Sequence, residues 1–151
     1  MTIKSQTLSY TADGDGLTGY MAYDDNSQSP RPGVMVIHEW WGLDDYIRTR
    51  ADRLAELGYT ALAIDMYGNG ATADSPDEAG AMMNAVLGNM ETGTSRLRAA
   101  HGVLCGQSVV DETRTAAIGY CFGGAMVLHM ARIGMPLKAC LLYTSPSPRD
   151  A

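Results

Sequence analysis

Residues 115–131, TAAIGYCFGGAMVLHMA, join an apolar run to an amphipathic pattern through a glycine-rich turn. The run TAAIGY is short, continuous and apolar, which is typical of a buried parallel strand. After the turn, apolar side chains recur at helical spacing. Cys121 lies between the two segments, flanked by Gly119 and Gly123. The stretch therefore predicts a strand, a sharp turn that carries a thiol, and a helix.

Strand-like segments precede and follow this stretch. Residues 7–12 and 17–24 alternate apolar and polar side chains around the sequence DGDG, which predicts an antiparallel hairpin. Continuous apolar runs at residues 34–38 and 59–68 predict buried strands, and residues 136–143 begin like another.

Helix signals stand between these runs. They are an aspartate cap at Asp44 or Asp45 with Gly58 at the helix end, a capping box at residues 75–78, and helical spacing over residues 94–106 and 123–133. Strands that alternate with helices indicate right-handed crossovers and a largely parallel sheet in an α/β fold.

Polar side chains follow three of the predicted strands. His38 and Glu39 end one strand, Asp65 ends another, and Cys121 ends a third. In open α/β sheets ligands bind at the carboxyl ends of the strands, so we expect a site at this edge. We expect Asp65 to anchor a loop there rather than to react.

The spacing Gly119-x-Cys121-x-Gly123 is that of a nucleophile elbow with cysteine in place of serine. Such a turn is so sharp that side chains at the glycine positions would collide with adjacent backbone. The helix that begins there directs amide dipoles at the sulfur, and the N–H of Phe122 is placed to stabilise an oxyanion. The pattern alone also fits an inert cysteine in a tight turn, but its position between a strand and a helix favours the elbow.

The motif VIHEWWGL, residues 36–43, follows another predicted strand. In hydrolases of this architecture a loop after an earlier strand supplies a second oxyanion N–H, and Trp40 is well placed to do so. Its neighbour Glu39 is placed to hydrogen-bond the Cys121 thiol or to suppress its reactivity.

The motifs HEWWGL, ALAIDMYG and GYCFGG, in this order and spacing, resemble those of the dienelactone hydrolase family over residues 34–139. The resemblance implies an α/β-hydrolase fold with helices on both faces of the sheet. It also implies an enzyme that opens esters or lactones through Cys121 and an acyl-thioester intermediate. Glu39 would contact the thiol in the resting enzyme, and the N–H groups of Trp40 and Phe122 would form the oxyanion hole.

Four more residues complete the expected site. Gly124 joins the two other elbow glycines, and His38, Trp41 and Tyr120 are expected to line the pocket. Ordinary packing explains Trp41 equally well. His38 precedes the glutamate and corresponds to no triad member of the family.

A triad in this fold runs nucleophile, acid, histidine along the chain. After Cys121 there is one histidine, His129, eight residues on in the same predicted helix, and one acid, Asp150. We therefore expect the family's catalytic acid and histidine to be missing and the turnover of this chain to be impaired.

The last segment, CLLYTSPSPRD, is similar to the in-frame translation of a sequencing-library adapter, and its Ser-Pro repeats interrupt the strand begun before it. We expect residues 1–139 to form one partial domain, incomplete at its C-terminus, and residues 140–151 to be a non-native tail.

Composition narrows the possible partners. The net charge is −6, and no basic cluster is present, which argues against nucleic acid and anionic membranes. No apolar stretch is long enough for a membrane span and the start has no signal-peptide core, so we expect a cytoplasmic protein. The three cysteines suggest neither a disulfide framework nor a zinc site. We expect a small ester or lactone as substrate, no metal and no cofactor; the sequence leaves the oligomeric state undetermined.

Two other interpretations stay open. The chain could be a non-catalytic protein that binds a ligand or senses oxidation through Cys121 on a hydrolase scaffold. A cysteine amidotransferase-like enzyme ranks lower, because it would require a downstream histidine and glutamate and would not be expected to show HEWWG.

Overall fold

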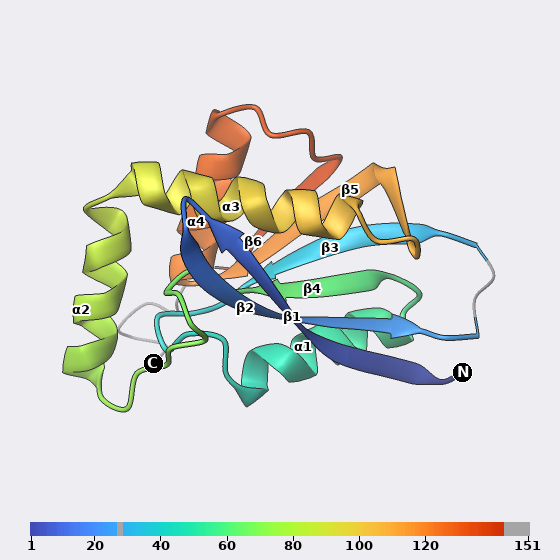
Figure 1. Cartoon of the computed structure of the whole chain (residues 1–151), viewed down its shortest axis with the longest axis horizontal. Helices are drawn as coiled ribbons and strands as arrows, with labels where there is room; N and C mark the ends of the chain where they lie inside the picture. Colours follow the sequence, from blue (N-terminus) through green and yellow to red (C-terminus); the bar gives the residue numbers. More distant parts are fainter. Residues whose placement is uncertain (27–28, 144–151) are drawn as a thin grey trace.

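The computed structural model of the chain describes residues 1–26 and 29–143, and within them one six-stranded sheet is flanked by four helices (Figure 1). The strands lie in the order β1-β2-β4-β3-β5-β6. Their bounds are Ile3–Ala12 for β1, Asp15–Asp24 for β2, Arg31–Ile37 for β3, Thr60–Ile64 for β4, Val110–Tyr120 for β5 and Ala139–Tyr143 for β6.

The four strands at one side of the sheet are parallel. β3 pairs in parallel with β4 and with β5, and β5 pairs in parallel with β6. β1 and β2 form an antiparallel hairpin, and β2 joins β4 in antiparallel register. The α/β architecture, with its mostly parallel sheet and N-terminal hairpin, is confirmed.

The hairpin turn consists of Asp13 and Gly14, which link the paired residues Ala12 and Asp15. Both turn residues have positive φ, 51° for Asp13 and 85° for Gly14. Two-residue loops of this kind match the right-handed twist of the strands, and aspartate followed by glycine is a preferred pair for them.

The helices begin at the caps that their sequences supply. Asp44 caps α1, Asp45–Glu56, by accepting the N–H of Ile47, and Ser75 caps α2, Pro76–Leu87, by accepting that of Glu78. α3, Met90–Cys105, begins before the predicted residue 94 because Asn89 caps it. α4, Phe122–Arg132, begins directly after Cys121. None of the helices in the described part of the chain is long and apolar enough to cross a bilayer.

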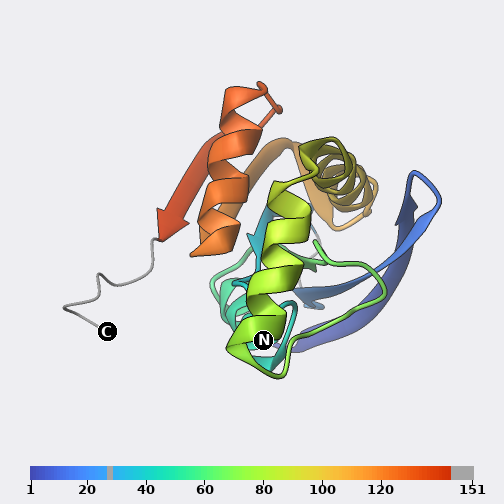
Figure 2. The ribbon, with the colours of Figure 1, turned by 90° about the vertical axis from the view of Figure 1, so that its left-hand side faces the viewer.

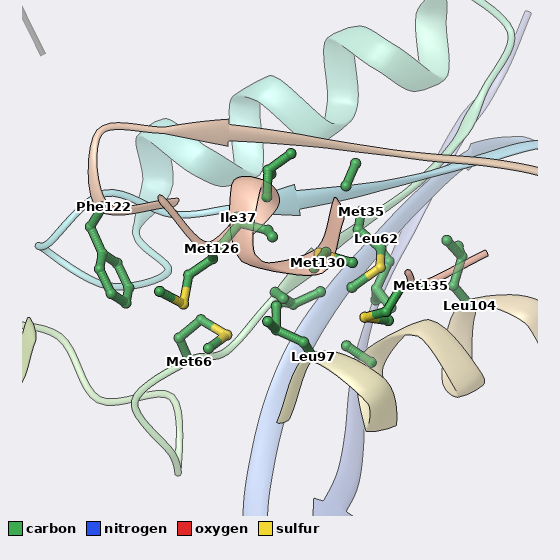
Figure 3. Packing of buried hydrophobic residues seen from close by; sticks show 14 of the residues in the cluster. Met35, Ile37, Leu62, Met66, Leu97, Leu104, Phe122, Met126, Met130 and Met135 are labelled. Carbon is green, nitrogen blue, oxygen red and sulfur yellow. The ribbon is translucent and has the colours of Figure 1, made fainter. Parts of the chain in front are cut away.

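Alternating side chains of the buried strands face two separate cores. In β3, Val34 and Val36 pack toward α1, whereas Met35 and Ile37 pack toward α3 and α4. Helices therefore cover both faces, as expected. The second core is rich in methionine, and Figure 3 shows Met35, Met66, Met126, Met130 and Met135 interleaved with branched side chains. α2 stands beyond the carboxyl ends of the parallel strands (Figures 1 and 2).

The sheet includes part of the segment that we expect to be non-native. Residues 140–143 lie in β6 and pair with β5. The rest of that segment, residues 144–151 with Asp150, lies outside the described residues. The boundary at residue 139 stays a prediction.

Asp65, at the carboxyl end of β4, holds a loop with four backbone hydrogen bonds. Its Oδ1 accepts the N–H groups of Tyr67 and Gly68, both at 2.9 Å. Its Oδ2 accepts those of Thr18 at 3.1 Å and Gly70 at 2.8 Å, so the carboxylate also ties this loop to β2. Only 1% of the side chain is exposed. The arrangement agrees with the loop-anchoring role expected for Asp65.

We predict that Asp65→Ala lowers the free energy of unfolding by about 3 kcal/mol, because it leaves several buried N–H groups without an acceptor. Urea denaturation would measure the change. Asp25→Ala, which removes a carboxylate from an exposed ion pair with Lys4, is the matched control and should cost about 0.5 kcal/mol or less. Equal losses in the two variants would contradict the anchoring role.

Candidate active site

The carboxyl ends of three strands meet through two aromatic rings. Tyr67, after β4, stacks on Phe122, after β5, with ring centroids 5.8 Å apart. The Tyr67 hydroxyl donates to the carbonyl oxygen of Trp40, after β3, at 2.7 Å. His38 lies against both rings, at 4.8 Å from Tyr67 and 5.8 Å from Phe122. The structure thus brings the predicted HEWWG and elbow motifs together.

Cys121 forms the turn between β5 and α4 in an uncommon backbone conformation. Its φ is 57° and its ψ is −113°, and its carbonyl oxygen accepts the N–H of Gly124 at 2.9 Å in the first turn of the helix. Its own N–H donates to the carbonyl oxygen of Tyr143 at 2.7 Å. A positive φ is sparsely populated for residues with a side chain, and such strain clusters at functional sites. The strained strand-to-helix turn predicted from the sequence is present.

The glycines around Cys121 permit close backbone contact. A Cβ atom at Gly119 would overlap the backbone of Gly123, and one at Gly123 would overlap the carbonyl oxygen of Ile37 at the end of β3. The restriction at Gly124 is milder, since a Cβ atom there would lie 3.3 Å from the carbonyl oxygen of Tyr143. A side chain at Gly123 would therefore force the elbow off β3, and one at Gly119 would force the first turn of α4 away from β5.

The loop after β3 is a tight turn from Glu39 to Gly42. The N–H of Gly42 donates to the carbonyl oxygen of Glu39 at 3.2 Å, and Gly42 has a φ of 95°. The carbonyl oxygen of Trp41 accepts the N–H of Ala73 at 3.0 Å, and the indole rings of Trp40 and Trp41 lie edge to face with centroids 5.6 Å apart. Both tryptophans are half-buried, so each keeps some surface for a ligand.

The N–H groups of Trp40 and Phe122, the residues expected to form the oxyanion hole, have no acceptor within residues 1–26 and 29–143. The same is true of the N–H groups of Glu39, Trp41 and Gly123 on the same two turns. Most backbone N–H groups in folded proteins are paired, so open donors on adjoining turns are suited to an anion or an oxyanion. Their catalytic role stays a prediction.

His38 is fully buried, and both of its ring nitrogens are hydrogen-bonded. Nδ1 lies 2.6 Å from the carbonyl oxygen of Glu39, and Nε2 accepts the N–H of Met66 at 3.1 Å. Burial lowers the pKa of the imidazole, which favours the neutral ring. His38 therefore supports the loop from beneath and exposes no surface to a ligand, contrary to the expectation that it lines the pocket.

Two charged side chains, Asp44 and Arg50, act on the carboxylate of Glu39. Burial and the carboxylate of Asp44 raise the pKa of Glu39, and the guanidinium of Arg50 lowers it. Arg50 is held over the rings of Tyr46 and Tyr120, with its Cζ at 4.9 Å and 5.5 Å from their centroids. The carboxylate of Glu39 accepts no hydrogen bond from the described residues, and its expected contact with the Cys121 thiol stays a prediction.

Sequence reasoning missed Tyr67 and Arg50. Tyr67 follows Asp65 at the end of β4, a signal that could have placed it at the edge, but its bond to Trp40 spans two separate strands. Arg50 shares α1 with Arg48 and Arg53. Only the packing of α1 against the sheet shows that Arg50 is the one that lies over Tyr120 and acts on Glu39. Tyr120, predicted to line the pocket, is half-buried and stacks on Tyr143 with centroids 5.4 Å apart.

His129, His101 and Cys105 have partners close by. His129 shares a hydrogen bond of 2.8 Å with Thr94 of α3, and His101 lies 3.6 Å from the Cys105 sulfur. Burial raises the pKa of both Cys105 and Cys140. No disulfide joins the three cysteines, all of which lie in the described ranges. The described residues contain no group of three or more histidine, cysteine or acidic side chains placed to hold a metal ion.

A family model and several known proteins match this chain. The model of the dienelactone hydrolase family matches residues 17–150. The protein usf of Aquifex pyrophilus is 32% identical over 133 residues, which cover 83% of this chain and 54% of that protein. This chain therefore spans about half the length of that relative.

Solved structures show the same relationship. The structure of m3DLH is 37% identical with a TM-score of 0.90, and the match covers 99% of this chain and 64% of that one. A dienelactone hydrolase-like promiscuous phosphotriesterase from metagenomic libraries is also 37% identical, with a TM-score of 0.89 over 93% of this chain and 59% of that one.

We predict that Gly123→Ala lowers the free energy of unfolding by about 3 kcal/mol, since the new methyl group would overlap the backbone of β3. The control is Gly102→Ala in α3, where a Cβ atom meets nothing within 4 Å; it should raise stability by about 0.5–1 kcal/mol. Thermal or urea unfolding would measure both. A neutral Gly123→Ala would show that the close approach is not required.

We predict that Arg50→Gln raises the pKa of Glu39 and that Asp44→Asn lowers it, because the first change removes a positive charge and the second a negative one. Asparagine preserves the helix cap at position 44. An NMR titration of the Glu39 carboxyl carbon would measure the pKa, and Arg53→Gln is the control from the same helix. Shifts of the same sign in the two variants would contradict this electrostatic picture.

Proposed function

Because the chain belongs to the dienelactone hydrolase family, we propose that it attacks the carbonyl of a small ester or lactone with the thiol of Cys121. The observation that carries the proposal is the strained turn at Cys121, because the next residue, Phe122, and Trp40 on the loop after β3 each have an N–H without an acceptor among the described residues. An ester carbonyl gains negative charge on its oxygen when attacked, and paired backbone donors stabilise that charge.

The proposed reaction has two steps. The Cys121 sulfur forms a bond to the carbonyl carbon, the carbon–oxygen bond to the alcohol portion breaks, and the alcohol oxygen takes up the proton that the thiol has lost. Water then attacks the thioester carbonyl, the carbon–sulfur bond breaks, and the carboxylic acid and the thiol are restored. In a lactone both products of the first step remain in one molecule.

The residues of this chain support the first step better than the second. Hydrolysis of a thioester needs a base that activates water, and His129 is bound to Thr94 on α3. Eight residues along one helix also place His129 about 12 Å from the elbow. We therefore propose that this chain acylates readily and hydrolyses the acyl-enzyme slowly.

We predict that p-nitrophenyl acetate gives a burst of about one equivalent of p-nitrophenolate per chain, followed by a slow steady rate. Absorbance would follow the release, and peptide mass spectrometry would locate the acetyl group on Cys121. Cys121→Ala should abolish the burst. Cys105→Ala is the matched control and should retain it, because burial raises the pKa of the Cys105 thiol. A burst that survives Cys121→Ala would overturn the proposal.

A further inference from the structure

We propose that His38 is a positioning residue, whose imidazole fixes the peptide between Glu39 and Trp40 so that the Trp40 N–H faces the oxyanion. The inference rests on the proposed function, in which that N–H is one of two oxyanion donors. It assigns to a fully buried side chain a role in catalysis without contact with the substrate.

The geometry of one peptide group supports the assignment. The Nδ1 of His38 lies 2.6 Å from the carbonyl oxygen of Glu39. That carbonyl and the N–H of Trp40 belong to the same planar peptide, and in a trans peptide they point in opposite directions. The imidazole that holds the carbonyl on one side therefore sets the direction of the N–H on the other.

The opposite side of the imidazole is fixed as well. Nε2 lies 3.1 Å from the backbone nitrogen of Met66, which is necessarily a donor. Nε2 must then be the acceptor, and Nδ1 carries the proton that goes to Glu39. The carbonyl oxygen of Met66, in the next peptide, accepts a hydrogen bond from Nη1 of Arg96 at 2.6 Å, so Met66 is itself held by α3.

Packing leaves the ring little freedom to turn. His38 lies against the rings of Tyr67 and Phe122 and has no exposed surface. Burial lowers its pKa, which keeps the ring in the neutral form that this pair of hydrogen bonds requires. The hydroxyl of Tyr67 also holds the next carbonyl, that of Trp40, at 2.7 Å.

A second donor to the Glu39 carbonyl does not replace the imidazole. The N–H of Gly42 reaches the same oxygen at 3.2 Å, but it belongs to the turn itself and would move with it. His38 instead joins the turn to β3, to the loop after β4 and, through Met66, to α3. It therefore fixes the turn relative to the surrounding elements. Preorganised catalytic donors require such support from outside their own loop.

Two reactions of the same sulfur separate positioning from folding. Acylation of Cys121 by p-nitrophenyl acetate passes through an oxyanion, whereas alkylation by iodoacetamide displaces iodide and forms none. In alkylation the sulfur bonds to the methylene carbon and iodide leaves with the electron pair. The ratio of the two rate constants at Cys121 therefore reports on the oxyanion donors, while alkylation alone reports on the thiol and its access.

Three substitutions at His38 test the two hydrogen bonds of the ring separately. In His38→Asn the amide nitrogen occupies the position of Nδ1 and keeps the donor to Glu39. In His38→Gln the amide reaches the position of Nε2 and keeps the acceptor for Met66, and His38→Leu keeps neither. The control is His101→Leu, which removes a half-buried imidazole hydrogen-bonded to Thr115 on another part of the sheet.

We expect His38→Asn to retain the acylation-to-alkylation ratio within about twofold, and His38→Gln and His38→Leu to lower it by about tenfold to a hundredfold. His101→Leu should leave the ratio unchanged. Rates would be measured by stopped-flow absorbance and by peptide mass spectrometry of Cys121, with circular dichroism to verify folding.

Every other outcome counts against the inference. An unchanged ratio in His38→Leu, or an equal fall in all three variants, would show that His38 acts through packing and not through its donor. Absence of any acylation in the unmodified chain would overturn the proposed function and this inference together. Normal acylation with an unmoved ratio would overturn the inference alone.

Discussion

The first turn of α4 lies in direct backbone contact with the end of β3, and the candidate site depends on this contact. Gly123 touches the carbonyl oxygen of Ile37, and no side chain fits between them. The turn at Cys121 has a positive φ, and the ring of Phe122 lies against His38, which precedes the loop that carries Trp40. Had the helix packed at an ordinary distance, as side chains require, the N–H groups of Trp40 and Phe122 would belong to separate parts of the surface.

Two buried polar side chains, Asp65 and His38, hold the backbone of the turns at the site. Asp65 binds four backbone N–H groups around the loop after β4, and His38 connects that loop with the turn after β3. Each is paired, so its burial costs little, whereas an unpaired group in the same place would cost about 1–3 kcal/mol. The site is therefore a pair of surface turns held by hydrogen bonds to buried polar side chains beneath them.

The charges that act on Glu39 come from α1 and its cap, and not from the buried polar groups beneath the turns. Arg50 is held by aromatic rings and acts on Glu39 through space, in opposition to Asp44. Arg50 of α1 therefore acts on the carboxylate while its guanidinium lies over the ring of Tyr120, the residue before the elbow cysteine.

Local sequence determined the strands, the hairpin turn and most helix starts, because alternation, caps and glycine act over a few neighbouring residues. It also identified the elbow, since Gly119 and Gly123 stand at fixed spacing from Cys121. The early start of α3 was missed because the Asn89 cap lies outside the apolar pattern. Only the tertiary structure decided that β4 lies between β2 and β3, that His38 is a buried support, and that Tyr67 and Arg50 join the site. Those features depend on contacts between strands and helices far apart in the chain, which no local pattern encodes.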